Sequence, residues 1–272
     1  MKTIKNLLAA AAAVAGTAAY AVKPNNRRAA AKRFDGLLYA HRGLHGENGP
    51  AENSLAAFAA ARAGGYGVEL DVRLTSDDRV VVCHDDDLTR LCGREGRISE
   101  LTYAELSEYT LSDGQHIPLF EEALEVLADS PIICELKSSG RMQAHLCKLT
   151  MDVVDRFSPV LCIESFDPQV VQWFKVNRPE IVRGQLACRH SLDPKHPDLK
   201  KLASANLVLN FYGKPDFIAY CHTDTDMPGF AACKKLYDPF CVAWTVCSRE
   251  ELDAAKANFS AFIFEGFIPQ SL

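Results

Sequence analysis

Short apolar runs recur along the chain from about residue 36, and helix-like segments separate them. Eight runs are long enough to form strands: 37–43, 66–72, 131–137, 160–166, 181–187, 206–212, 240–246 and 261–267. Each run is apolar almost without interruption, which is typical of parallel strands that are buried on both faces. Eight such strands alternating with helices predict an α/β protein with a closed (β/α)8 fold, the TIM barrel.

A ninth apolar run, 80–84, follows the second strand too closely to be a barrel strand. The link 76–79 is so short that the two runs can pair only as an antiparallel hairpin. If the two central residues of this link form the loop, Asp71 lies opposite His84. The hairpin is therefore expected to fold the imidazole of His84 back onto Asp71.

The segment 85–130 is longer than a normal barrel connection. It contains a candidate capping box, Thr102 with Glu105, and a second helix start at 117–124. We interpret this segment as a small insertion after the second strand. It is expected to overhang the C-terminal mouth of the barrel, where active sites of this architecture lie.

An apolar segment precedes the barrel. Residues 6–22 carry no charge, and a helix of this length spans about 25 Å, just short of the ~30 Å core of a bilayer. One interpretation is a secretory signal that is cleaved after the A-x-A site at 19–21. The other is an uncleaved N-terminal helix that anchors the protein, and we favour it. Five basic residues follow the segment and two precede it, so the positive-inside rule would keep the barrel in the cytoplasm. We thus expect an anchor or signal with a basic linker at 1–35 and a barrel domain at 36–272.

Composition and charge narrow the choice of partners. Of the 272 residues, 48% are apolar and 24% are charged, as in an ordinary folded protein. The first 35 residues hold seven of the 30 basic residues and one acidic residue. The remaining chain therefore has 23 basic and 34 acidic residues, a net charge of −11. An acidic body argues against nucleic acid as a partner, because phosphate backbones require a basic surface.

Four fragments place ionisable side chains where a buried strand would normally carry Val or Leu. They supply His41 and Arg42, Glu69 and Asp71, His84 and Asp85, and Glu135 and Lys137. Because each fragment ends an apolar run, all four are expected at the mouth of the barrel. Two carboxylates spaced two apart on a strand share a face, and at ~4 Å they repel by roughly 4 kcal/mol at an effective dielectric near 20. A cation is therefore expected beside them.

The residue types in these fragments suit phosphoester cleavage. The carboxylates of Glu69, Asp71 and Glu135 are hard oxygen ligands of the kind that Ca²⁺ or Mg²⁺ prefers. The two histidines can act as general acid and general base near neutral pH. Arg42 and Lys137 can bind an anionic group, the first as a planar fork and the second as a point charge.

The order and spacing of these motifs resemble the glycerophosphodiester phosphodiesterase family. The matching motifs are His41-Arg42-Gly43, Glu52-Asn53-Ser54, Glu69-Leu70-Asp71-Val72, His84-Asp85 and Glu135-Leu136-Lys137. The resemblance implies a TIM barrel with a small insertion that hydrolyses glycerophosphodiesters to sn-glycerol 3-phosphate and an alcohol. It further implies a divalent metal at Glu69, Asp71 and Glu135, acid/base catalysis by His41 and His84, and phosphate contacts from Arg42 and Lys137.

The sequence departs from the family pattern at the end of the barrel. The family usually carries a Thr-Asp pair after the last strand, where this chain has Glu265-Gly266. The resemblance therefore assigns no substrate contact there. Trp244 is expected to line the pocket and contact the substrate. Six further histidines are expected mainly at the surface: His45, His116, His145, His190, His196 and His222.

Three alternatives stay open at this point. The substrate could be a lysophospholipid, which would make the protein lysophospholipase D-like and would suit a membrane anchor. The same barrel could belong to a phosphodiesterase that resembles a phosphoinositide phospholipase. A binding module that does not catalyse is the third alternative, and the intact pair of His41 and His84 argues against it.

Overall fold

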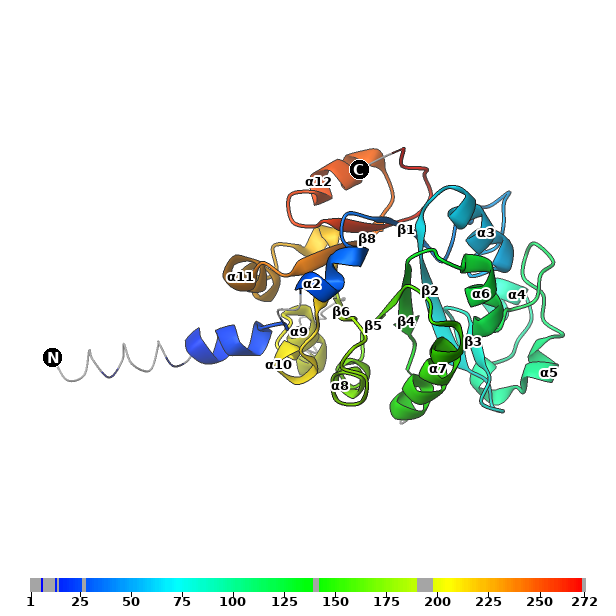
Figure 1. The fold of residues 1–272 in the computed structure, drawn as a ribbon, viewed down its shortest axis with the longest axis horizontal. Coiled ribbons are helices and arrows are strands. Elements are labelled where there is room, and N and C mark those ends of the chain that lie inside the picture. The colour runs from blue at the N-terminus through cyan, green and yellow to red at the C-terminus, as the bar shows by residue number, and fades with distance from the viewer. Residues whose placement is uncertain are drawn as a thin grey trace.

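The computed structural model describes residues 6, 13, 15–25, 28–138, 142–189 and 198–270. Nine strands form one sheet in the order β1-β9-β8-β7-β6-β5-β4-β2-β3, and pairing of β1 with β2 closes it. The strands are β1 (Leu38–His41), β2 (Gly67–Leu74), β3 (Val80–Val82), β4 (Ile132–Leu136), β5 (Leu161–Ser165), β6 (Arg183–Ala187), β7 (Phe217–Cys221), β8 (Phe240–Val246) and β9 (Ala261–Phe264). Eight strands are parallel, and only β3 runs antiparallel. The predicted (β/α)8 barrel is confirmed (Figure 1).

Helices surround this barrel. The longer ones are α3 (Leu55–Ala63), α6 (Phe120–Leu127), α7 (Gln143–Phe157), α8 (Pro168–Asn177), α9 (Leu199–Ala205), α11 (Pro228–Tyr237) and α12 (Arg249–Ala255). Several begin at capping residues: the side chains of Ser54, Asp167 and Ser248 accept hydrogen bonds from the first turns of α3, α8 and α12. Apolar side chains of the helices and of the outward strand positions form the larger core, between the helices and the sheet.

A second core fills the barrel interior, and its lower end is closed by the segment before β1. The short helices α2 (Arg28–Ala31) and η1 (Lys32–Phe34) lead into β1. Phe34 is fully buried, and its carbonyl accepts a hydrogen bond of 3.0 Å from the hydroxyl of Tyr39. Phe217 lies in the same interior cluster, directly over Gly184, where a Cβ would come within 2.2 Å of its ring. Side chains therefore fill the barrel interior at this end.

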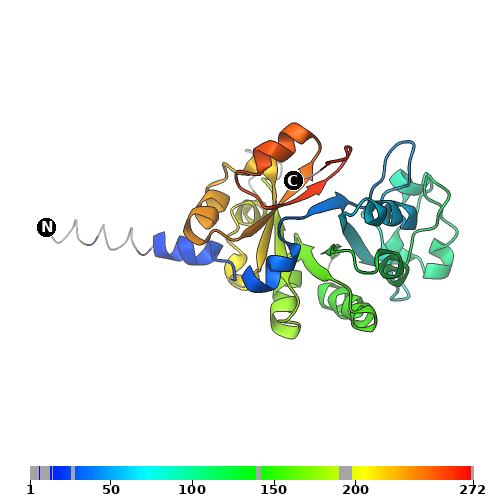
Figure 2. The same cartoon turned by 45° about the horizontal axis from the view of Figure 1, so that its top comes forward.

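The N-terminal segment is fastened near this closed end. Residues 15–22 are helical, and the helix projects beside α9, α10 (Asn210–Gly213) and α11 (Figures 1 and 2). The Tyr237 hydroxyl donates to the carbonyl of Ala19 at 2.9 Å, and the Asn210 amide donates to that of Val22 at 3.0 Å. Within the described part of the chain, no helix is both long and apolar enough to cross a bilayer. Residues 7–12 and 14 of the predicted 6–22 helix lie outside the described residues.

The strand predicted at 206–212 is wrong. This segment follows α9 and continues into α10. The sixth strand of the barrel is instead β7, which begins at Phe217. Val208, Phe211 and Tyr212 are each more than a third exposed, whereas the side chains at 217–220 are completely buried. Both segments are apolar runs of similar length, and the polar stretch 213–216 that separates them is the only local mark of the true strand start.

The hairpin between β2 and β3 also differs from the prediction by one residue. Val72 pairs with Val82, and the backbone N–H of Cys83 donates to the carbonyl of Asp71 at 3.0 Å. Cys83, not His84, therefore lies opposite Asp71. The reason is a three-residue loop that ends with Asp78 in the left-handed region at φ 64°, a common hairpin geometry.

The insertion follows β3 and has a small core of its own. Its short helices are α4 (Thr89–Cys92), η2 (Ile98–Glu100) and α5 (Tyr103–Leu106). Val81, Leu88, Ile98 and Tyr109 are buried together beneath them. The predicted capping box is present at the start of α5. The insertion lies at the opposite end of the molecule from the N-terminal helix (Figures 1 and 2).

Candidate active site

The strand register brings the predicted polar side chains to one end of the barrel. His41 on β1 is level with Glu69 on β2, and Asp71 is level with Glu135 on β4. Residues that are level on neighbouring parallel strands point to the same face, here the barrel interior. The four fragments of the sequence thus meet at the C-terminal mouth, as their positions at strand ends predict.

Three buried carboxylates form a compact group there. Each of Glu69, Asp71 and Glu135 offers one oxygen, and these oxygens lie within 4.8 Å of one another. The ammonium group of Lys137 lies 2.7 Å from Glu135 and 3.1 Å from Asp71. Asn53 donates a further hydrogen bond of 2.9 Å to Asp71.

The three carboxylates differ in how well their charge is compensated. Burial, followed by repulsion from Asp71, raises the pKa of Glu69 well above its usual range. Burial also raises the pKa of Glu135, to about 7. Burial has the same effect on Asp71, but Lys137 and Arg42 outweigh it and hold the pKa of Asp71 below its usual range. Lys137 and Arg42 therefore balance the negative charge of Asp71. The other two carboxylates, Glu69 and Glu135, lack enough positive charge nearby.

This group has the properties of a site for a divalent cation. All its donors are hard oxygens, they converge from two adjacent strands, and two of them lack sufficient positive charge nearby. A divalent cation between them would supply that charge. The residues present therefore fit Ca²⁺ or Mg²⁺, the metals expected from the sequence.

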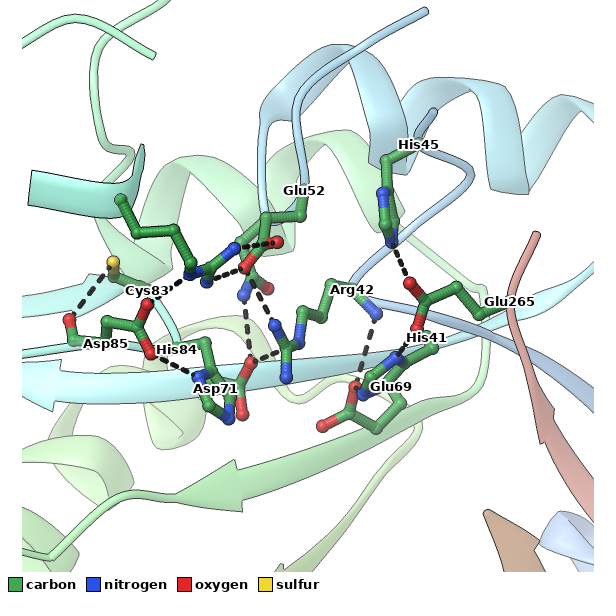
Figure 3. Close-up of polar contacts among 12 residues, drawn as sticks. His41, Arg42, His45, Glu52, Glu69, Asp71, Cys83, His84, Asp85 and Glu265 are labelled. Carbon is green, nitrogen blue, oxygen red and sulfur yellow. Dashed lines mark hydrogen bonds and ion pairs between the residues drawn. The ribbon is translucent and has the colours of Figure 1, made fainter. Parts of the chain in front are cut away.

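Arg42 links the carboxylate group to the loop that follows β1. Its backbone lies in the left-handed region at φ 55°, and its N–H donates to Glu69 at 3.2 Å. Its guanidinium lies 2.8 Å from Glu52 and 3.5 Å from Asp71. The charge of Arg42 is thus held beside the carboxylate group, as Figure 3 shows.

His41 is oriented by a residue from the far end of the chain. Its Nδ1 lies 2.5 Å from a carboxylate oxygen of Glu265, directly after β9 (Figure 3). Since a carboxylate only accepts hydrogen bonds, Nδ1 carries the proton and Nε2 is left facing Glu69, 3.9 Å away. This hydrogen bond holds the pKa of Glu265 down, at about 2. The departure from the family pattern at Glu265 therefore lies in direct contact with a predicted catalytic histidine.

His84 is oriented by its neighbour in the chain. Its Nδ1 lies 2.6 Å from Asp85, which leaves its Nε2 free in the same way (Figure 3). Arg90 of the insertion binds Asp85 at 2.6 Å and holds Glu52 with two hydrogen bonds of 2.8 Å. Burial lowers the pKa of His84, which favours the neutral ring.

A cavity of about 150 Å³ lies between these groups. His41, Arg42, His84 and Lys137 line one side, together with the metal-site carboxylates Glu69 and Glu135. The other side is mainly apolar and includes Trp244, as expected from the sequence. The Trp244 ring packs edge-on against Phe166 with ring centroids 5.5 Å apart.

Sequence reasoning missed several groups at this site. It assigned no role to Glu265, to Arg90 or to Glu164, a fully buried carboxyl group that also lines the cavity. The side chain of His45 is only 16% exposed and lies 3.7 Å from Glu265, so its expected surface position is wrong. The side chain of His222 is also largely buried, whereas those of His116 and His145 are exposed. The remaining two predicted surface histidines, at 190 and 196, lie outside the described residues.

Fold and site together define the class: a TIM barrel with an acidic metal-type site, two histidines and two cations at its mouth. The sequence profile of the glycerophosphoryl diester phosphodiesterase family matches residues 41–252. The chain belongs to this family.

Curated relatives agree with this assignment. A glycerophosphodiester phosphodiesterase of Bacillus altitudinis is 41% identical over 113 residues, 38% of this chain and 45% of the relative. The human lysophospholipase D GDPD1 is 34% identical over 141 residues, 47% of this chain and 43% of the relative. A glycerophosphodiester phosphodiesterase of Caldanaerobacter subterraneus is 28% identical over 229 residues and covers 80% of this chain and 88% of the relative. The first two matches span about half the length of these relatives.

Solved structures show the same fold. A phosphodiesterase of Oleispira antarctica, in complex with its product sn-glycerol-3-phosphate, superposes with a TM-score of 0.70 at 23% identity, covering 86% of this chain and 94% of that one. A glycerophosphodiester phosphodiesterase of Parabacteroides distasonis gives a TM-score of 0.65 at 26% identity, with coverages of 85% and 93%.

Proposed function

We propose that the protein hydrolyses glycerophosphodiesters to sn-glycerol 3-phosphate and an alcohol, with the help of a divalent metal. The observation that carries this proposal is the convergence of two carboxylate-oriented histidines on a cavity that also holds the acidic group and two cations. Family membership supports the same reaction.

Each side chain has a distinct task in this proposal. Arg42 and Lys137 bind the phosphate oxygens and offset their charge. The Nε2 atoms of His41 and His84 face the reacting ester, and one removes a proton from the attacking oxygen while the other protonates the leaving oxygen. Both rings hold their Nδ1 protons toward a carboxylate. The ring that acts as base therefore accepts its proton at Nε2, and the ring that acts as acid carries a second proton at Nε2, which it gives to the leaving oxygen.

Glu69, Asp71 and Glu135 would hold the metal ion. When bound there, a divalent cation would polarise a phosphoryl oxygen and lower the cost of the charge that develops on it. The neighbouring position of Lys137 keeps Asp71 ionised and available as a ligand.

The experiment is an assay for released sn-glycerol 3-phosphate. Full-length protein is incubated with glycerophosphocholine or glycerophosphoethanolamine in Ca²⁺, Mg²⁺ or Mn²⁺. We expect turnover with at least one metal, and complete loss of turnover in EDTA that is reversed by excess metal. Full activity in metal-free protein would refute the metal role, and no turnover of either substrate with any metal would refute the proposed reaction.

A lysophospholipid is a second candidate substrate because of a larger cavity beside the site. This cavity, of about 670 Å³, is lined by apolar side chains including Leu44, Phe264, Phe267 and Ile268, and it borders on Glu265. It offers room for an acyl chain, and one relative is named a lysophospholipase D. Release of choline from lysophosphatidylcholine at a rate comparable with that from glycerophosphocholine would support this substrate, and no release would exclude it.

We also propose that the segment 6–22 attaches the protein to a membrane with the barrel in the cytoplasm. The uncharged stretch and the five basic residues after it support this orientation. We expect the full-length protein to stay in the membrane fraction and to be degraded by protease only in opened cells. A shortened protein in the periplasm or medium would contradict this and would indicate a cleaved signal.

A further inference from the structure

The 150 Å³ cavity has two chemically different walls. The catalytic wall carries the histidines and the cations that suit a phosphate. The opposite wall carries Phe166, Leu186, Trp244 and Ile263, with one carboxyl group among them, that of Glu164. The catalytic wall suits the phosphate of the substrate. The opposite wall is mainly apolar and must bind another part of the substrate.

Glu164 occupies an inward position of the barrel. It lies on β5, level with Glu135 on one side and with Gly184 on the other. It is 1% exposed, and its Oε2 atom is buried without a hydrogen-bond partner among the described residues. A buried polar atom without a partner destabilises a folded protein, so a site that contains one suits a ligand with a matching polar group.

The metal site does not account for this atom. The group whose oxygens lie within 4.8 Å of one another consists of Glu69, Asp71 and Glu135, and Glu164 does not belong to it. Among the described residues, the cations near the mouth also have other partners, since Lys137 binds Asp71 and Glu135. Glu164 lines the cavity that the substrate would fill, and its Oε2 atom has no partner among the described residues.

The surroundings of Glu164 suit a small polyol. The rings of Phe166 and Trp244 stand edge to face and present apolar surface for C–H groups. The Nε1 atom of Trp244 is a second buried polar atom without a partner on this wall. A carboxyl group beside aromatic rings can accept hydrogen bonds from hydroxyls while the rings contact the carbon chain.

We propose that Glu164 is a substrate-binding residue whose carboxyl group accepts a hydrogen bond from a hydroxyl of the substrate's glycerol moiety, with Phe166 and Trp244 against its carbon chain. This inference rests on the proposed function. It assigns the polyol end of the substrate to the β5–β8 side of the mouth and the phosphate to the β1–β4 side.

The test compares two ligands that differ only in their hydroxyls. Binding of sn-glycerol 3-phosphate and of n-propyl phosphate to the full-length, metal-loaded protein is measured by calorimetry. We expect the wild-type protein to bind sn-glycerol 3-phosphate more tightly. Glu164→Gln, which has nearly the same shape, should weaken its binding about tenfold and change the binding of n-propyl phosphate by less than twofold. Glu180→Gln, at an exposed position, is the matched control and should change neither.

Other outcomes would overturn the inference. An equal loss for both phosphates would place Glu164 at the phosphate, and a weaker affinity for Mn²⁺ in Glu164→Gln would make it a metal ligand. If Glu164→Gln kept the wild-type preference for sn-glycerol 3-phosphate, Glu164 would have no role in binding the glycerol moiety. If Glu164→Gln does not fold, Glu164→Leu, which is apolar in a buried position, should lose the same preference. If the wild-type protein binds neither phosphate, the proposed function itself fails, and this inference fails with it.

Discussion

The two histidines at the mouth are held by carboxylates of different origin. His84 bonds to Asp85, its neighbour in the chain, whereas His41 bonds to Glu265, 224 residues further along. Glu265 reaches His41 only because β9 pairs with β1 and closes the barrel. Asp85 is in turn held by Arg90 of the insertion. The orientation of the His41 ring therefore depends on closure of the whole barrel. The orientation of the His84 ring depends on the β2–β3 hairpin and the insertion.

Removing either ring should produce the largest effect. We expect His41→Ala and His84→Ala each to lower kcat by about 10²–10⁴, because each removes one partner of the proton transfer. Both variants should keep the far-ultraviolet circular dichroism of the folded barrel. His145→Ala is the control, since this exposed histidine pairs with Asp78 at the surface. Activity within tenfold of the wild type in both active-site variants would exclude the assignment.

Replacing Glu265, the distant partner of His41, should lower kcat by a smaller factor. We expect Glu265→Ala to lower kcat about 10- to 100-fold, the range typical of groups that orient the side chains of a metal site, because the His41 ring loses its acceptor. The ¹⁵N shifts of its imidazole should then show a changed balance of the two tautomers.

Two further variants make this test specific. Glu265→Gln keeps an acceptor oxygen and should recover part of the activity. Glu47→Ala removes a carboxylate from the same neighbouring cavity and should have little effect. An unchanged kcat in Glu265→Ala would show that closure of the barrel does not control the histidine.

Replacing Asp85, the partner of His84, should mainly shift one limb of the pH profile of kcat/KM. Burial lowers the pKa of His84, and the hydrogen bond that His84 donates to Asp85 opposes this by raising the pKa. Asp85→Asn should therefore lower the pKa of His84 further and move the corresponding limb of the kcat/KM profile to lower pH. Asp86→Asn is the control, because Asp86 binds Ser99 and Arg97 within the insertion. A limb that moved to higher pH would contradict this role of Asp85.

Much of the barrel could be predicted because its strands are buried on both faces. Seven of the eight proposed apolar runs overlap a barrel strand, and their polar ends marked the mouth. The prediction failed for the remaining run, 206–212, because apolarity alone does not separate a strand from a helix that packs on the barrel. The side chains at 206–212 look as apolar as those of β7, and only the packed structure shows which of them are exposed.

The site could be predicted where its groups lie close together in the chain. Glu69 and Asp71 share a strand, and the spacing of Glu135 and Lys137 is equally local. Glu265 could not be found in this way, because its role depends on the pairing of the first strand with the last. A one-residue difference in the hairpin loop likewise placed Cys83 instead of His84 opposite Asp71, since loop type and not strand pattern sets that register.

The fastening of residues 19–22 near the closed end of the barrel has a practical consequence. A support, tag or fusion partner joined at the N-terminus would lie away from the C-terminal mouth and leave the entrance to the active site clear. A partner joined at the C-terminus would be harmful, since residues 264–268, near that end, form part of the larger cavity beside the entrance. Immobilised or labelled forms of this protein should therefore be coupled through the N-terminus.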